Sequence, residues 1–136
     1  MVEITVRYEG DLRCSATHGP SGTVILTDAP VDNHGKGESF SPTDLLAAAL
    51  PACMMTIMGI VAAREGVDLR GMTATTKKVM STDAPRRIAS LCTVITLPIA
   101  ADHPHRAKFE QAAHTCPVHK SLREAMDASV EFVYAG

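Results

Sequence analysis

Apolar and polar residues alternate near both ends of the chain, which is the pattern of strands with one buried face. The first such segment is Val2–Tyr8 (VEITVRY), and the last is Ser129–Tyr134 (SVEFVY). Thr23–Thr27 (TVILT) is a short apolar run that follows the turn residues of His18–Gly22. The N-terminal part is therefore predicted to be a hairpin or meander of strands.

The second half of the chain predicts two more strands and two short helices. Strands are expected over 71–80 and 87–98, joined by a turn at 83–86, and helices over 106–114 and 117–125. With a long helix between the strand pairs, the predicted order is β-β-α-β-β-α-α-β. That order is typical of the α+β class, and 136 residues favour a single domain spanning 1–136.

The longest apolar segment has a clear helix start. Ser41 is a suitable N-cap, Pro42 fits the first helical position, and Asp44 stands where a capping box needs an acceptor. No charged residue occurs from Leu45 to Ala63, and Gly66 is suited to end the helix after Glu65.

This uncharged helix is long enough either to span a membrane or to be buried all round in a protein core. Its alanine content, the internal Pro51 and its place between amphipathic strands favour the buried helix. One small chain has difficulty surrounding a helix of about 35 Å, at ~1.5 Å per residue. The sequence therefore predicts a homodimer, no membrane span, and a bend near Pro51, whose ring crowds the preceding turn.

Composition excludes some classes of function and indicates a compartment. Thirteen basic residues stand against fifteen acidic ones, and tryptophan is missing, so the chain has neither the basic face nor the stacking residues of a nucleic-acid binder. The first eight residues lack the apolar stretch of a signal peptide. The four cysteines form no CxxC pair. We expect a reduced, cytoplasmic protein.

Two of the four cysteines are candidates for chemistry. Cys116 directly precedes Pro117 and is expected to be the N-cap of a short helix, where the helix dipole favours a thiolate. Cys53 lies in the apolar helix and needs a nearby cation to be a nucleophile, so catalytic and structural roles both stay open. Cys14 and Cys92 are interpreted as small buried hydrophobic residues.

The segment around Cys116 also contains a partial set of metal ligands. Imidazole and thiolate groups suit zinc, and His114 and His119 flank the cysteine. Structural zinc sites usually have two pairs of ligands, and only three ligands lie close together here. We therefore expect no metal and no cofactor.

Three segments resemble the OsmC/Ohr family of thiol-dependent peroxidases: YEGDLR, SPTDLLAAALPACMMTIM and TCPVHKSLREAMDASVEFVY. The resemblance implies a swapped α+β homodimer with two long, buried central helices packed back to back, antiparallel sheets from both chains around them, and active sites at the interface. It further implies that Cys53 is the peroxidatic cysteine, Cys116 the resolving one, and Arg13 the cation that holds the thiolate. Cys53 would form a sulfenic acid and then a disulfide with Cys116, which an external thiol or dithiol reduces.

The chain departs from the family pattern at the residue that normally orients the arginine. A glutamate is usual at the third position of the helix start, where this chain has Thr43. Asp44 is one residue away, about 100° around the helix, and points elsewhere. Glu38 could reach the arginine from the preceding loop. Together with Pro51 in place of a small residue, this departure indicates a divergent OsmC-like subgroup.

The resemblance implies a cytoplasmic peroxidase of the oxidative-stress response, acting on organic hydroperoxides and less well on hydrogen peroxide. An apolar lining would suit such substrates, although the same residues are equally expected in the core: Leu50, Met54, Met55 and Met58. The alternative is a non-catalytic OsmC-like protein that binds a small apolar ligand at the dimer interface.

Overall fold

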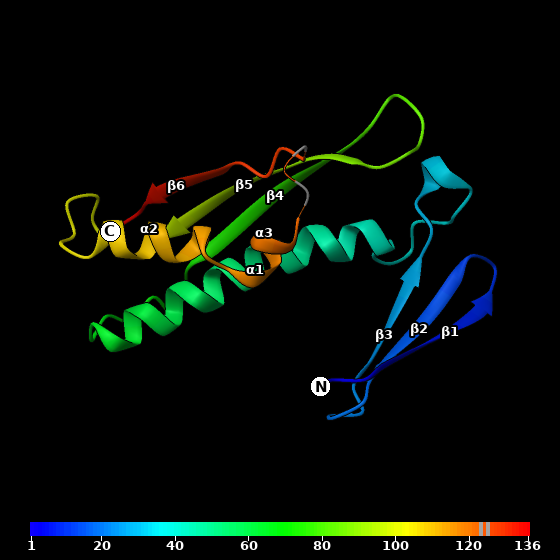
Figure 1. Cartoon of the computed structure of the whole chain (residues 1–136), viewed down its shortest axis with the longest axis horizontal. Helices are drawn as coiled ribbons and strands as arrows, with labels where there is room; N and C mark the ends of the chain where they lie inside the picture. The colour runs from blue at the N-terminus through cyan, green and yellow to red at the C-terminus, as the bar shows by residue number, and fades with distance from the viewer. Residues whose placement is uncertain (123, 125) are drawn as a thin grey trace. The chain divides into compact units, whose positions relative to one another are not determined.

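The computed structural model describes residues 1–122, 124 and 126–136, and within them three strands precede the longest helix and three follow it (Figure 1). The predicted α+β class is confirmed. The chain divides into two units, Met1–Leu46 and Ala47–Gly136, and the longest helix begins in the first and continues into the second. A single functional domain over 1–136 stays a prediction.

The first unit contains an antiparallel sheet in the order β1-β2-β3. Its strands are β1 (Ile4–Gly10), β2 (Arg13–His18) and β3 (Val24–Asp28). The sequence analysis missed β2, so the predicted element order was one strand short. The reason is physical: RCSATH has no large apolar side chain, and its apolar positions hold only Cys14 and Ala16. Gly10, Asp11 and Leu12 have positive φ in the turn that delivers Arg13 to the start of β2.

One face of this sheet is apolar and uncovered in the single chain. Ile4, Val6 and Tyr8 alternate along β1 and are each more than 60% exposed. Tyr8 pairs with Cys14, and Val6 pairs with Ala16, so the apolar face continues onto β2. A three-stranded sheet needs an apolar face packed against something to be stable.

The long helix α1 (Pro42–Arg64) has the predicted start and end. Ser41 and Asp44 form the expected capping box, and Gly66, with φ 70°, follows the last turn. By length and composition alone, α1 could cross a membrane, a criterion that core helices of soluble proteins also meet. The bend expected at Pro51 stays a prediction.

The single chain buries one side of α1 only, so burial all round, which was expected with a second copy of the chain, stays a prediction. One side is fully buried, with Leu50, Met54 and Met58 at 0% exposure, while Leu46 and Ile60 on another side are exposed. One small sheet can cover only one side of a helix, so the remaining side is left uncovered by this chain.

The second unit contains a sheet in the order β4-β5-β6. β4 (Thr73–Met80) and β5 (Ile88–Leu97) are antiparallel, as expected, but β6 (Val130–Tyr134) runs parallel to β5. The expected antiparallel pairing is confirmed for the other strands, and the pairing of β6 with β5 is the exception. The chain passes through two helices before it reaches β6, which is the crossover that a parallel pairing needs. Leu91, Ile95 and Leu97 of β5 belong to the same buried cluster as the covered side of α1.

Two short helices precede β6. α2 (Arg106–His114) has the predicted bounds, and its Phe109 is fully buried in the core. α3 (Pro117–Ser121) is shorter than the predicted 117–125, because Leu122 already has an extended backbone. Residues 123 and 125 of the predicted helix lie outside the described residues. Val31–Asn33 forms a single 3-10 turn, η1, in the loop before α1.

Candidate active site

Cys116 is the N-cap of α3, as the sequence predicted. Its backbone is extended, and its Sγ accepts a hydrogen bond from the backbone N–H of His119 at 3.3 Å. The side chain is fully buried. Burial raises the pKa of the thiol above its ordinary value of 9.0, and it outweighs the opposing effect of the His119 N–H. The raised pKa contradicts the expectation that the position of Cys116 favours a thiolate.

Cys53 lies beside Cys116 in the second unit. It projects from α1, is half-buried, and packs against the core cluster that contains Cys116. A side-chain hydrogen bond and the charge of Cys53 both act on Cys116 and raise its pKa further. The fold thus brings together the two cysteines that the sequence singled out, from α1 and from the start of α3.

The histidines that flank Cys116 form a small aromatic group. The rings of His114 and His119 meet edge to face at 6.1 Å between centroids, and His114 meets Phe132 in the same manner at 5.9 Å. Nδ1 of His119 is buried without a hydrogen-bond partner among the described residues. Within residues 1–122, 124 and 126–136, no three His, Cys, Asp or Glu side chains are grouped to hold a metal ion.

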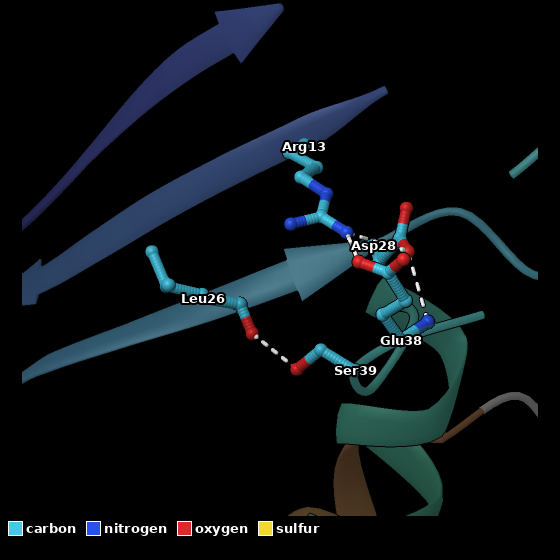
Figure 2. A network of polar contacts seen from close by, with 5 residues as sticks. All are labelled: Arg13, Leu26, Asp28, Glu38 and Ser39. Carbon is cyan, nitrogen blue, oxygen red and sulfur yellow. Dashed lines mark hydrogen bonds and ion pairs between the residues drawn. The ribbon is translucent and has the colours of Figure 1, made fainter. Parts of the chain in front are cut away.

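Arg13 is held by two carboxylates in the first unit (Figure 2). Its Nη2 atom pairs with Oε2 of Glu38 and lies 3.4 Å from Oδ2 of Asp28. Glu38 is exposed, whereas Asp28 is only 1% exposed. The hydrogen bond with Glu38 is the main reason that the pKa of the Arg13 guanidinium is raised. The predicted pairing of Arg13 with Glu38 is therefore present within this unit.

Asp28 was missed by the sequence analysis. Its Oδ2 accepts a hydrogen bond from the backbone N–H of Glu38 at 2.9 Å, and this bond, followed by the charge of Arg13, lowers the pKa of the carboxyl group. The position of Asp28 was the available signal in the sequence. Asp28 immediately follows the apolar run TVILT, which places a charged residue at the buried end of β3. A buried charge requires a partner, and the arginine at the paired position of β2 supplies it.

The loop between β3 and α1 is fastened to β3 immediately after Glu38. Ser39 Oγ donates to the carbonyl of Leu26 at 2.9 Å (Figure 2). The N–H of Asp28 donates to the carbonyl of Phe40 at 3.1 Å. These bonds fix the backbone from which Glu38 reaches Arg13.

Thr43 and Asp44 are engaged at the start of α1. Thr43 Oγ1 lies 3.1 Å from Ser41 Oγ, and Oδ2 of Asp44 accepts the N–H of Ser41 at 2.9 Å. Asp44 thus serves the helix cap. Of the two acidic residues considered as substitutes for the glutamate missing at Thr43, Glu38 is the one that contacts Arg13.

The remaining sequence candidates have other positions. Leu50, Met54 and Met58 are fully buried core residues, and Met55 is half-buried, so the core interpretation holds for the first three. Cys14 and Cys92 are only half-buried, contrary to the expectation of buried hydrophobic residues. Cys92 Sγ lies 3.8 Å from Asp127 Oδ2.

Comparison with known proteins gives the chain a family. The sequence model described as "OsmC-like protein" matches residues 35–131. A crystal structure of a protein from Psychrobacter arcticus, assigned to the osmotic stress induced and detoxification response, is 47% identical with a TM-score of 0.90, covering 97% of this chain and 96% of that one. No curated protein matches the chain.

Two more distant structures share the fold. An OsmC-like protein from Mycoplasma pneumoniae is 15% identical with a TM-score of 0.83, covering 100% of this chain and 98% of that one. The organic hydroperoxide resistance protein OhrB of Bacillus subtilis is 19% identical with a TM-score of 0.69, covering 97% of each chain.

Proposed function

The chain belongs to the OsmC-like protein family, and we propose on this basis that it is a thiol-dependent peroxidase that reduces organic hydroperoxides. Family membership supports a peroxide-related redox role, and several structural neighbours are named for organic hydroperoxide resistance. The observation that carries the proposal is the pairing of Cys53 with Cys116, from two distant parts of the sequence, in one unit.

Cys53 is the residue that reacts with the peroxide. Its thiolate attacks the terminal peroxide oxygen, an S–O bond forms, and the O–O bond breaks. The alkoxide that leaves takes a proton and becomes an alcohol, while Cys53 is oxidised by two electrons to a sulfenic acid. Being half-buried on α1, Cys53 is accessible to a small molecule in a way that the fully buried Cys116 is not.

Cys116 resolves the sulfenic acid. Its sulfur attacks the sulfur of Cys53, the S–S bond forms and the S–O bond breaks, and the hydroxide leaves with the proton of Cys116 as water. The raised pKa of Cys116 suits this order of events, because a second thiolate beside Cys53 would oppose formation of the first. An external thiol or dithiol then reduces the disulfide and is itself oxidised by two electrons.

Arg13 is the cation proposed to hold the Cys53 thiolate, with Glu38 as a carboxylate partner that orients it. The ion pair in the first unit supports this role, because a guanidinium fixed by carboxylates is pre-organised to present its remaining N–H groups to an anion.

A homodimer is part of the proposed function. The single chain leaves uncovered the apolar face of β1, with Ile4, Val6 and Tyr8, and one side of α1 that includes Ile60. A Cβ built on Gly59 would meet nothing within 4 Å, so a second helix could approach α1 closely there. A second copy of the chain, packed on both surfaces, would remove them from water, with the catalytic residues at the interface.

Intact mass measurement after one equivalent of cumene hydroperoxide tests the peroxidase. The wild-type protein is expected to lose two hydrogens as the disulfide forms, and Cys116→Ser to gain one oxygen at Cys53. Cys53→Ser should be unchanged, and Cys92→Ser, which removes another half-buried thiol, should behave as wild type. No mass change in the wild-type protein, together with saturable binding of an apolar probe, would instead support the non-catalytic binding protein.

A further inference from the structure

Arg13 has more hydrogen-bonding capacity facing Asp28 than it uses. The contact between them joins Nη2 and Oδ2 at 3.4 Å, which is long for a charged hydrogen bond. Nε of Arg13 and Oδ1 of Asp28 are both buried and have no hydrogen-bond partner among the described residues. One is a donor and the other an acceptor, on two side chains that already touch.

These two atoms complete a known arrangement of the pair. A carboxylate can bind a guanidinium side-on, with Nε and Nη2 donating to its two oxygens. Here Nη2–Oδ2 is one half of that arrangement, and the unpartnered Nε and Oδ1 are the other half.

Burial distinguishes the two carboxylates that hold Arg13. Glu38 is 60% exposed, and ion pairs with exposed side chains are weakened by water and salt. Asp28 is 1% exposed and is anchored in β3, opposite Arg13 in the register of β2 and β3. Asp28 also receives the backbone N–H of Glu38, so it fixes the position of both members of the exposed pair.

We propose that Asp28 is the principal positioning residue of Arg13 in the peroxidase site, with Glu38 as its secondary, solvent-facing partner. The role assigned to Asp28 rests on the proposed function, because Arg13 is taken to serve the Cys53 thiolate. It also accounts for Thr43: a chain that holds its arginine from β3 does not need a glutamate at the start of α1.

The test compares cumene hydroperoxide consumption by wild type, Asp28→Asn, Glu38→Gln, Arg13→Gln and the two double variants that contain Arg13→Gln. Asn keeps the size of the side chain and an oxygen to accept the Glu38 N–H. Asp28→Asn is expected to lower kcat/KM by about tenfold or more, and Glu38→Gln by about threefold or less. In the Arg13→Gln background, Asp28→Asn should have no further effect, because it acts through Arg13.

The pH profile of Cys53 alkylation by iodoacetamide, followed on the Cys53 peptide by mass spectrometry, separates positioning from other roles. Removing a negative charge near a thiolate shifts the midpoint to lower pH, whereas releasing the guanidinium shifts it to higher pH. Asp28→Asn and Arg13→Gln should both shift it to higher pH. A merely structural role would lower the thermal midpoint of Asp28→Asn without moving this profile, and Asp28→Glu, which keeps the charge, should recover part of the activity.

The outcomes separate the two hypotheses. If the wild type consumes peroxide and Asp28→Asn equals it, or if Glu38→Gln is the more damaging change, the role of Asp28 is overturned and the peroxidase stands. If the wild type consumes no peroxide, the proposed function fails, and the alkylation profile still decides whether Asp28 acts on Cys53 through Arg13.

Discussion

The backbone N–H of His119 donates to Sγ of Cys116, and yet the pKa of this thiol lies above its ordinary value. One hydrogen bond at the start of a short helix compensates only part of the cost of placing a thiolate in a fully buried position. The two candidate cysteines therefore differ in environment, since Cys53 is half-buried and Cys116 is not exposed at all.

Cys116 is consequently expected to react slowly with iodoacetamide in the folded protein at neutral pH. Its rate should keep rising as the pH passes 9.0, the ordinary value, because the folded thiol ionises later than an unfolded one. Peptide mass spectrometry measures the rate at each pH, and the same protein in urea is the control, in which Cys116 should react as an ordinary thiol. A fast reaction of folded Cys116 at neutral pH would contradict the raised pKa.

The same pKa shift predicts how stability depends on pH. A group whose pKa is raised by folding contributes fully below its unfolded pKa, and the contribution is lost as the pH rises through the folded pKa. For Cys116 the loss begins above 9.0. Urea unfolding from neutral to alkaline pH should show a larger decline in the wild-type protein than in Cys116→Ser. Equal declines in both proteins would mean that Cys116 is not the cause.

The capping box at the start of α1 predicts a measurable loss of stability. Ser41 Oγ accepts a hydrogen bond from the N–H of Asp44 at 3.1 Å, and Oδ2 of Asp44 accepts one from the N–H of Ser41. Ser41→Ala is expected to lower the free energy of unfolding by about 1 kcal/mol. Ser121→Ala, which removes an exposed hydroxyl bonded to the Pro117 carbonyl, is the control and should change it by less than about 0.5 kcal/mol. Equal effects of the two changes would show that the cap contributes nothing particular.

This cap also shows what local sequence can predict. Ser41, Pro42 and Asp44 act on one another within a single turn, so their arrangement followed from their spacing. The bounds of α2 were also predicted, although no side chain caps its N-terminus. β2 was missed because its side chains are small, and a middle strand is defined by its neighbours β1 and β3 rather than by its own pattern.

The candidate site was predictable only in part. Cys116 could be placed as an N-cap from Pro117, but its pKa depends on core residues distant in sequence, so the direction of the shift was predicted wrongly. Glu38 was considered because it lies near the helix start in sequence. Asp28 was not, because its contact with Arg13 depends on the register of β2 with β3, and β2 itself had not been identified.

The proposed homodimer predicts opposite results at two neighbouring positions of β1. Val6 lies on the exposed apolar face with Ile4 and Tyr8, and Thr5 points to the opposite face of the sheet. Val6→Glu is expected to weaken the dimer, because it would place a charge in the interface, and Thr5→Glu to leave it intact. Light scattering coupled to gel filtration measures both. A wild-type protein that is a stable monomer near 14.4 kDa would contradict the dimer itself.

Introducing the family glutamate at Thr43 tests whether the missing carboxylate limits the proposed peroxidase activity. Arg13 already has carboxylate partners in Asp28 and Glu38, so a third one would not add a missing anchor. Thr43→Glu is expected to leave kcat/KM for cumene hydroperoxide within about threefold of wild type.

In the Asp28→Asn background the same change should recover activity, because the arginine then lacks its buried partner. Thr43→Gln, of similar shape but uncharged, is the control and should recover none. A gain of about tenfold or more from Thr43→Glu in the otherwise wild-type chain would mean that Asp28 and Glu38 do not replace the glutamate.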